Sequence, residues 1–234
     1  MTTTAPPNTW ALPSLALPSL ALPSLALPSL ALPSLGMHSS GLDGLGLYSA
    51  QALYLFAPLV VGMVVLGVAL RFDLGRWLRR PVDARLTVRG RRVFGANKTW
   101  LGMLCSLLGC TLGVAVQAAV GDRAGDLALI HYRAEIVLPL GATLSLGATA
   151  GELINSFVKR QLDVPPGRPG HGWWGPLLHV VDQVDFLVTL WPLLLLWLTP
   201  DWPLVLLSFG WTFVLHQAIT LTGRRIGLTG RAPS

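Results

Sequence analysis

Three acidic residues lie at the borders of long apolar stretches, where burying a charged carboxylate costs free energy: Glu152, Asp182 and Asp185. They flank one polar segment, residues 151–185, that separates two apolar stretches. A carboxylate at a membrane boundary must face water, a partner or a metal. Hard oxygen ligands suit Mg²⁺, which proteins usually hold with one or two carboxylates plus substrate phosphates. The segment is therefore our candidate reaction centre, with these three acids as candidate metal ligands.

The chain after Gly151 carries polar groups at helical spacing. Four of them follow one another at i, i+3, i+4 and i+7: Glu152, Asn155, Ser156 and Lys159. This spacing places them on one helix face. A polar stripe at this depth must face a cavity or other helices, because lipid cannot satisfy it. The alternative is a helix-end cluster that pairs internally and extends toward water.

Asp182 and Asp185 are spaced i and i+3, where we expect the next helix to begin. The dipole of a helix N-terminus favours acidic residues, and this is the structural alternative to a metal-binding role. The preceding loop is rich in Gly and Pro, so it can approach a ligand closely, and His171 can present donors to a phosphate.

Lys98 and Thr99 precede the expected start of a helix at Trp100. Free backbone N–H groups at a helix start favour phosphate binding. The glycine and lysine spacing of a P-loop is absent. We therefore take Lys98 and Thr99 as candidate substrate-binding residues of another kind.

The elements that position these residues are apolar helices. The chain is 52% hydrophobic and 12% charged, against about 25% charged residues in soluble domains. Five segments are candidates to span a bilayer: 51–70, 100–120, 136–156, 186–200 and 202–222. We expect an all-α polytopic membrane protein with five transmembrane helices. Glycines interrupt the third segment, but small residues also permit close helix packing.

The basic residues predict the orientation. Of 17 Lys and Arg, 15 lie between residues 71 and 98, in the 157–185 loop, or after the last segment. Basic loops stay cytoplasmic, so we expect the N-terminus outside, the C-terminus inside, and cytoplasmic loops at 71–99 and 157–185. Omitting the third segment would put these two loops on opposite sides. The first loop is either a topology signal alone or also attracts anionic headgroups.

Residues 1–49 differ from the rest. Residues 11–35 repeat Ala-Leu-Pro-Ser-Leu five times, and a proline at every fifth position blocks a regular helix. We expect a disordered tail followed by a membrane domain at 50–234. The basic residues adjoin the bilayer and form no recognisable nucleic-acid module, which excludes nucleic acid as a partner.

Three strings together resemble the CDP-archaeol synthase family, within the phosphatidate cytidylyltransferase-like membrane enzymes: Arg92–Trp100, Gly151–Arg160 and Asp182–Phe186. The resemblance covers roughly residues 50–230. It implies transfer of CMP from CTP to a lipid phosphate, archaetidic or phosphatidic acid-like, giving CDP-lipid and pyrophosphate in phospholipid biosynthesis. The family usually has Gly-Asp where this chain has Gly151-Glu152.

The resemblance also implies roles for single residues. The implied Mg²⁺ ligands are Glu152, Asp182 and Asp185. The implied catalytic residues are Lys159, Arg160, Asp182 and Asp185. The implied substrate-binding residues are Lys98, Thr99, Asn155, Ser156 and His171.

CTP, a lipid phosphate and membrane lipids are the expected partners, and a homodimer stays open. We expect the plasma membrane, with the active site facing the cytoplasm. Two other readings remain: a small transporter for an anionic substrate, and an inactive scaffold of the same fold. The charged residues gather on one membrane face and no inverted repeat is visible, which counts against a transporter.

Overall fold

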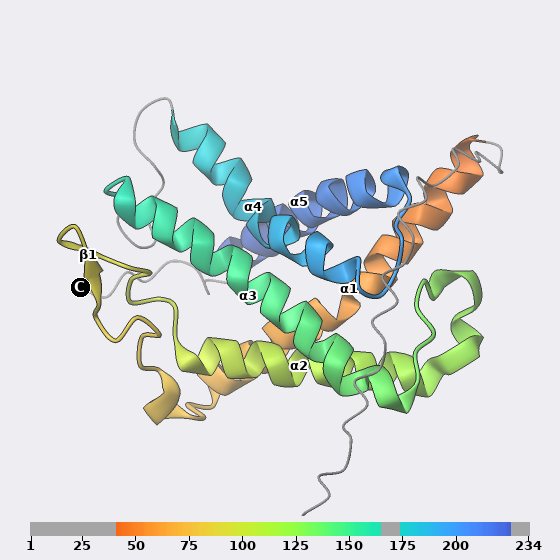
Figure 1. The fold of residues 1–234 in the computed structure, drawn as a ribbon, viewed down its shortest axis with the longest axis horizontal. Coiled ribbons are helices and arrows are strands. Elements are labelled where there is room, and N and C mark those ends of the chain that lie inside the picture. Colours follow the sequence, from red (N-terminus) through yellow and green to blue (C-terminus); the bar gives the residue numbers. More distant parts are fainter. Residues whose placement is uncertain (1–40, 165–173, 226–234) are drawn as a thin grey trace, which may run out of the picture. The chain divides into compact units, whose positions relative to one another are not determined.

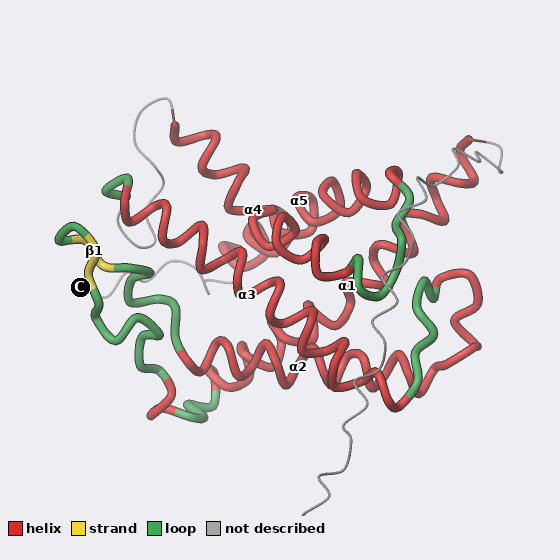
Figure 2. Tube along the Cα trace, in the orientation of Figure 1, coloured by secondary structure: helices red, strands yellow, loops and turns green. Residues whose placement is uncertain are grey.

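The structure, a computed structural model, describes residues 41–164 and 174–225 of the 234-residue chain. Five helices dominate this part (Figure 1): α1 (Gly41–Arg71), α2 (Trp100–Val120), α3 (Val137–Gln161), α4 (Trp174–Leu194) and α5 (Trp202–Arg225). The two short strands, β1 (Thr87–Val88) and β2 (Arg91–Arg92), pair between α1 and α2 (Figure 2). The expected helical fold is confirmed.

Three helical stretches among the described residues are long and apolar enough to cross a membrane: 44–71, 100–127 and 134–161. The third expected segment is therefore a continuous helix in spite of its glycines. Helix α4 occupies the fourth expected segment in part, and α5 spans the whole of the fifth. Five crossings and the orientation of the termini stay predictions.

The fourth segment begins earlier than predicted. Helix α4 starts at Trp174, not at residue 186, so Asp182 and Asp185 lie well inside it. The dipole explanation for these acids is therefore wrong, because the dipole acts within the first turn. Pro176 falls in that first turn, where its missing N–H costs no hydrogen bond.

The expected 157–185 loop is also too long. Helix α3 continues to Gln161, which leaves residues 162–173 as the connection to α4. At the other end of the chain, α1 begins at Gly41, inside the stretch expected to be the tail. The repeat itself lies outside the described residues.

Small residues bring the helix backbones into direct contact. A Cβ atom on Gly109 of α2 would lie 2.3 Å from the Cα atom of Gly62 in α1. A Cβ atom on Gly147 of α3 would lie 2.9 Å from the Cα atom of Leu190 in α4. Between these contacts, fully buried leucines form much of the core: Leu55, Leu140, Leu144, Leu187, Leu190, Leu194 and Leu204.

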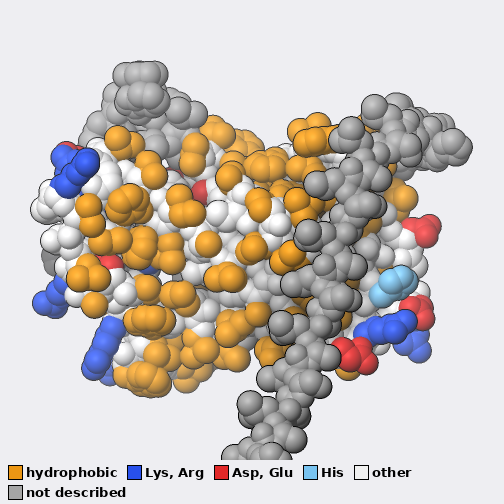
Figure 3. Space-filling model, viewed as in Figure 1, with side chains coloured by type: hydrophobic (Ala, Val, Ile, Leu, Met, Phe, Trp, Pro, Cys, Tyr) orange, Lys and Arg blue, Asp and Glu red, His pale blue; other side chains and the backbone are white. Residues whose placement is uncertain are grey.

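Polar groups lie at the two ends of the helical bundle. Figure 3 shows Lys and Arg side chains at one end of the visible face, a mixed charged group at the other, and hydrophobic side chains between them. The segment that joins α1 to α2 meets the end of α3, because Arg91 pairs with Asp163 and Lys98 pairs with Glu152. The basic segment at 71–98 and the C-terminal end of α3 thus lie at the same end of the bundle.

Candidate active site

The polar stripe on α3 faces two acidic residues on α4. The Asn155 amide nitrogen donates to Asp182 Oδ1 and to Asp185 Oδ2, each at 2.7 Å. Lys159 forms an ion pair with Asp182. Asp185 also accepts a hydrogen bond from the backbone N–H of Phe186 at 2.8 Å. The stripe therefore faces another helix, as a polar face within a membrane protein must.

Helices α3 and α4 run side by side (Figure 1), and a regular register of contacts between them creates this cluster. The α3 residues that meet α4 are four apart: Gly147, Gly151, Asn155 and Lys159. Their contacts on α4 run in the opposite direction at similar spacing: Leu190, Phe186 and Asp182. Rows of residues four apart are natural contact ridges of a helix. The same row thus supplies small residues at one end and polar residues at the other.

Gly151 sets the distance between the two helices beside the acids. A Cβ atom there would lie 2.5 Å from Phe186 Cα and 2.6 Å from the Asp185 carbonyl oxygen. Real Cβ atoms essentially never approach other atoms below 3.0 Å. Only glycine therefore permits this close approach at the Asp185 turn.

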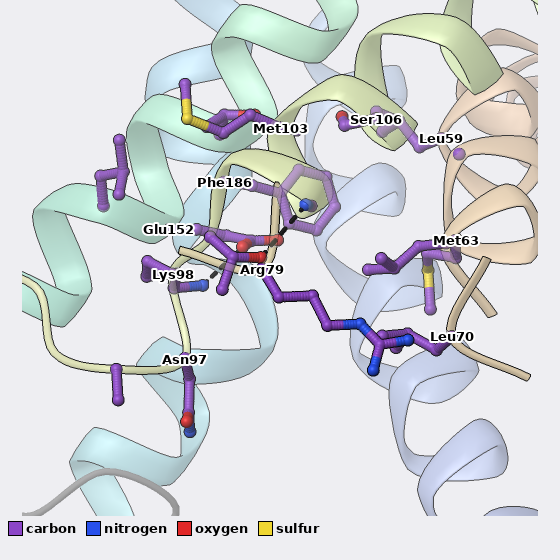
Figure 4. A pocket seen from close by; sticks show the side chains of 18 residues that line it. Leu59, Met63, Leu70, Arg79, Asn97, Lys98, Met103, Ser106, Glu152 and Phe186 are labelled. Atoms are coloured by element: carbon purple, nitrogen blue, oxygen red, sulfur yellow. Dashed lines mark hydrogen bonds and ion pairs between the residues drawn. The ribbon is translucent and has the colours of Figure 1, made fainter. Parts of the chain in front are cut away.

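Lys98 joins the α1–α2 segment to α3. Its ammonium group lies 2.5 Å from Glu152 Oε2, and Figure 4 shows this contact as a dashed line. The next residue, Thr99, caps α2, since its hydroxyl oxygen accepts a hydrogen bond from the Gly102 N–H at 3.3 Å. The expected helix start after Lys98 and Thr99 is confirmed.

Asp83 organises the segment that leads to Lys98. Its buried carboxylate accepts hydrogen bonds from Arg92 Nη2 at 2.5 Å, Gly95 N at 3.0 Å and Phe94 N at 3.2 Å. Burial by itself would raise the pKa of Asp83, but the hydrogen bonds from Arg92 and the backbone outweigh it and lower the pKa to about 2. Gly95 has φ +94°, a conformation that favours glycine.

Two backbone hydrogen bonds complete this support. Val82 N donates to the Lys98 carbonyl oxygen at 2.8 Å, and Trp100 N donates to the Arg80 carbonyl oxygen at 3.2 Å. Asp83, next to Val82, thus fixes the backbone on which Lys98 stands. Our sequence analysis missed Asp83, because the loop of nine basic residues holds two acids, Asp73 and Asp83, and nothing local distinguishes them.

The three predicted metal ligands do not form one ready-made site. Within residues 41–164 and 174–225 there is no group of three or more His, Cys, Asp or Glu side chains that could hold a metal ion. Glu152 is engaged by Lys98, whereas Asp182 and Asp185 direct one oxygen each at the same Asn155 nitrogen. Two neighbouring carboxylates are ligands of the kind that Mg²⁺ takes, together with water and phosphate, but here Asp182 and Asp185 would have to exchange their bonds to Asn155 and Lys159 for the metal. Mg²⁺ stays a prediction.

Three other predicted residues are less defined. Ser156 lies one position after Asn155 on α3. Arg160 has a buried Nε atom without a hydrogen-bond partner in the described part of the chain. His171 lies outside the described residues.

A cavity of about 590 Å³ opens beside Lys98 and Glu152 (Figure 4). Its lining comes from α1, α2, α3 and the segment before α2, and Phe186 connects it to the acidic cluster. Arg79 also lines this cavity. The sequence analysis did not single out Arg79, because nothing local separates it from the other basic residues of its loop, which was read as a topology signal alone or as also attracting anionic headgroups.

Comparison with known proteins identifies the family of this chain. A family model described as CarS-like CDP-archaeol synthase matches residues 51–230. The chain belongs to this family. The resemblance drawn from the three strings is therefore confirmed, together with its extent. The CDP-archaeol synthase family places this chain among integral membrane proteins of lipid metabolism.

Individual members of the family show moderate identity. The CDP-archaeol synthase of Pyrococcus furiosus is 38% identical over 110 residues, which cover 47% of this chain and 57% of the relative. That of Methanopyrus kandleri is 33% identical over 151 residues, covering 62% of this chain and 74% of the relative. The chain thus spans little more than half the length of several curated relatives that it matches.

A solved structure described as an intramembrane enzyme for archaeal membrane lipid biosynthesis has a similar fold. It superposes with a TM-score of 0.55 and 27% sequence identity, covering 73% of this chain and 92% of that one. The helical arrangement around the site therefore has a counterpart among solved membrane enzymes.

Proposed function

We propose that this protein transfers CMP from CTP to a lipid phosphate, producing a CDP-lipid and pyrophosphate. One observation carries the proposal: an acidic and basic cluster on α3 and α4 adjoins an apolar cavity with a cationic end. The relatives are named CDP-archaeol synthases, so we propose an archaetidic acid-like phosphate as the first substrate to test, with the ester-linked phosphatidic acid as its competitor.

The chemistry demands positioning more than proton transfer. An oxygen of the lipid phosphate attacks the α-phosphorus of CTP, a new P–O bond forms, and the bond to the bridging oxygen breaks, so pyrophosphate leaves with the electron pair. The attacking phosphomonoester is already an anion, so no strong general base is needed. Phosphoryl-type transfer is accelerated mainly by alignment and charge neutralisation.

The basic residues of the cluster supply that neutralisation. Lys98 and Lys159 are each held by one carboxylate, Glu152 and Asp182, at the end of the bundle where the substrates would meet. Phosphate oxygens can take the place of these carboxylates as partners of the ammonium groups. Asn155, which is held between Asp182 and Asp185, would orient the phosphate oxygens.

Mg²⁺ would be held by Asp182 and Asp185, with Glu152 nearby, and it supplies charge neutralisation of the triphosphate when bound. Asp182 and Asp185 lie close enough to share the Asn155 amide group as a donor, and metal binding would replace these hydrogen bonds. We further propose that this end of the bundle faces the cytoplasm, where CTP is available, and that the N-terminus lies outside. A homodimer has no support in the comparisons.

The direct test is synthesis of CDP-lipid by the purified protein. Protein in detergent is incubated with labelled CTP, Mg²⁺, and ether-linked or ester-linked lipid phosphates. Wild-type protein should form labelled CDP-lipid, and Asp182→Asn should reduce turnover by about 100-fold or more while the protein stays folded, because an oriented charged ligand is lost.

Asp122→Asn is the matched control, since Asp122 is an exposed acid of the 3₁₀ helix after α2, η2 (Gly121–Leu127). It should keep the wild-type rate. Absence of product with every lipid phosphate, or full activity of Asp182→Asn, would refute the proposal. Flux of an anion through proteoliposomes without product would instead favour the transporter.

A further inference from the structure

The cavity beside Lys98 has an apolar side and a cationic end. The apolar side is formed largely by α1, through Leu59, Met63, Leu66 and Leu70. The polar end carries Arg79, Asn97, Lys98, Thr99 and Glu152. An apolar slot that ends in cations matches an amphiphile with an anionic headgroup, because each part of the ligand meets its own kind of surface.

The two cations at this end differ in their partners. Lys98 is compensated by Glu152 at 2.5 Å. Arg79 is held by Asp73 through one nitrogen, with Nη1 2.8 Å from Asp73 Oδ1. A guanidinium group has five N–H donors in a planar fork, so this single contact leaves donors for a second anion.

The turn before Arg79 fixes its direction. Asp73 has φ +56° and Gly75 has φ +62°, and the short helix η1 (Arg76–Leu78) follows directly. Asp73 also receives Arg76, whose Nε lies 2.9 Å from Asp73 Oδ2. The carboxylate thus holds two arginines, of which only Arg79 lines the cavity. In Figure 4 the Arg79 side chain extends toward Met63 and Leu70 of α1.

We propose that this cavity is the site of the lipid substrate and that Arg79 binds its phosphate, with the hydrocarbon lying along α1. The nucleotide then belongs to the α3–α4 side, at Asn155, Lys159 and Asp182. The inference rests on the proposed function, and it divides the site into a lipid half and a nucleotide half. Arg79 suits this role because an arginine fork can bind two phosphate oxygens at once.

Arg79→Gln tests the division, and Arg76→Gln is its matched control. Both arginines pair with Asp73, but the Arg76 side chain is 79% exposed and lies outside the cavity lining. Arg79→Gln removes charge-assisted hydrogen bonds to the phosphate, so we expect the KM for a short-chain dialkylglycerol phosphate to rise by about 10- to 100-fold. The KM for CTP should stay within about twofold, and Arg76→Gln should change neither value. Arg79→Lys, which keeps the charge and loses the fork, should fall between.

A binding measurement separates this inference from the proposed function. Titration of the detergent-solubilised protein with the same lipid phosphate, without CTP, should show the same loss of affinity in Arg79→Gln. A raised KM for CTP with unchanged lipid affinity would overturn the inference, as would equal effects of Arg76→Gln and Arg79→Gln. If the wild-type protein makes no CDP-lipid, the proposed function fails, and the titration still decides whether Arg79 binds the lipid phosphate.

Discussion

Gly151→Ala is the sharpest test of the contact between α3 and α4. The added methyl group would lie 2.5 Å from Phe186 Cα, 2.6 Å from the Asp185 carbonyl oxygen and 2.6 Å from Thr189 Oγ1. Two of these three atoms belong to the α4 backbone, so no side-chain rotation relieves the overlap. The helices must separate at this turn.

The required movement can be worked out from ordinary contacts. A Cβ atom normally stays at least 3.4 Å from such neighbours, so α4 must move by about 1 Å in a core packed to crystal-like density. That shift stretches the 2.7 Å hydrogen bond from Asn155 to Asp185 toward the limit of about 3.5 Å for such bonds. A 1 Å error in a reacting assembly can reduce the rate by about 100-fold.

The effect on stability should be smaller than the effect on rate. Overpacking costs about 1–3 kcal/mol, and replacing a helical glycine by alanine returns about 1 kcal/mol. We expect the midpoint of thermal unfolding in detergent to fall by a few degrees at most. The measurements are kcat for CDP-lipid formation and the unfolding midpoint of the same preparation.

Gly210→Ala in α5 is the control for a glycine-to-alanine change in a helix. A Cβ atom at Gly210 meets nothing within 4 Å, so both turnover and folding should be retained. Wild-type kcat in Gly151→Ala, with its unfolding midpoint unchanged, would refute the idea that this glycine sets the geometry of the acids. Equal loss of activity in both variants would refute it as well.

Two further predictions concern the carboxylates at the edge of the site. Glu152→Asp should retain turnover, because the ion pair with Lys98 survives a change of one methylene; complete loss of kcat would show that the longer side chain is required. The lowered pKa of Asp83, about 2 against an ordinary 3.8, means that its stabilising effect is complete above about pH 4 and is lost as the pH falls toward 2. Asp83→Asn should therefore lower the free energy of unfolding at neutral pH by about 2 kcal/mol. It should also reduce the loss of stability that wild-type protein shows between pH 4 and pH 2. Thermal unfolding midpoints that fall as steeply with acid as those of wild type would contradict this.

The polar face of α3 could be predicted from the sequence because helical periodicity is local. Glu152, Asn155 and Lys159 needed only their spacing to be assigned to one face. The start of α4 could not be predicted in the same way, since an apolar stretch marks where hydrocarbon would lie and a helix can continue beyond it. Asp182 and Asp185, which were predicted to lie at a helix start, consequently lie inside a helix in the structure.

Asp83 and Arg79 could not be assigned from local pattern. Asp83 acts through Arg92 and Gly95, nine and twelve residues away, and Arg79 reaches the cavity through a turn with two residues at positive φ. Both positions depend on how an irregular segment folds back upon α2 and α3. A motif such as the Lys98-Thr99 pair can be recognised along the chain, but the residues that support its backbone are found only from the contacts in the structure.

The α3 row of Gly147, Gly151, Asn155 and Lys159 links the fold to the chemistry. Two glycines bring the backbones of α3 and α4 together, and the next two positions in the same row meet Asp182 and Asp185. An acid inside a helix of a membrane protein requires a partner, and the row provides an amide and an ammonium group within hydrogen-bond reach. The distance that the glycines set is therefore also the distance across which Asp182 and Asp185 receive hydrogen bonds from α3. Helix packing and the placement of the proposed reacting groups are one structural property in this protein, so a change at Gly151 must affect both.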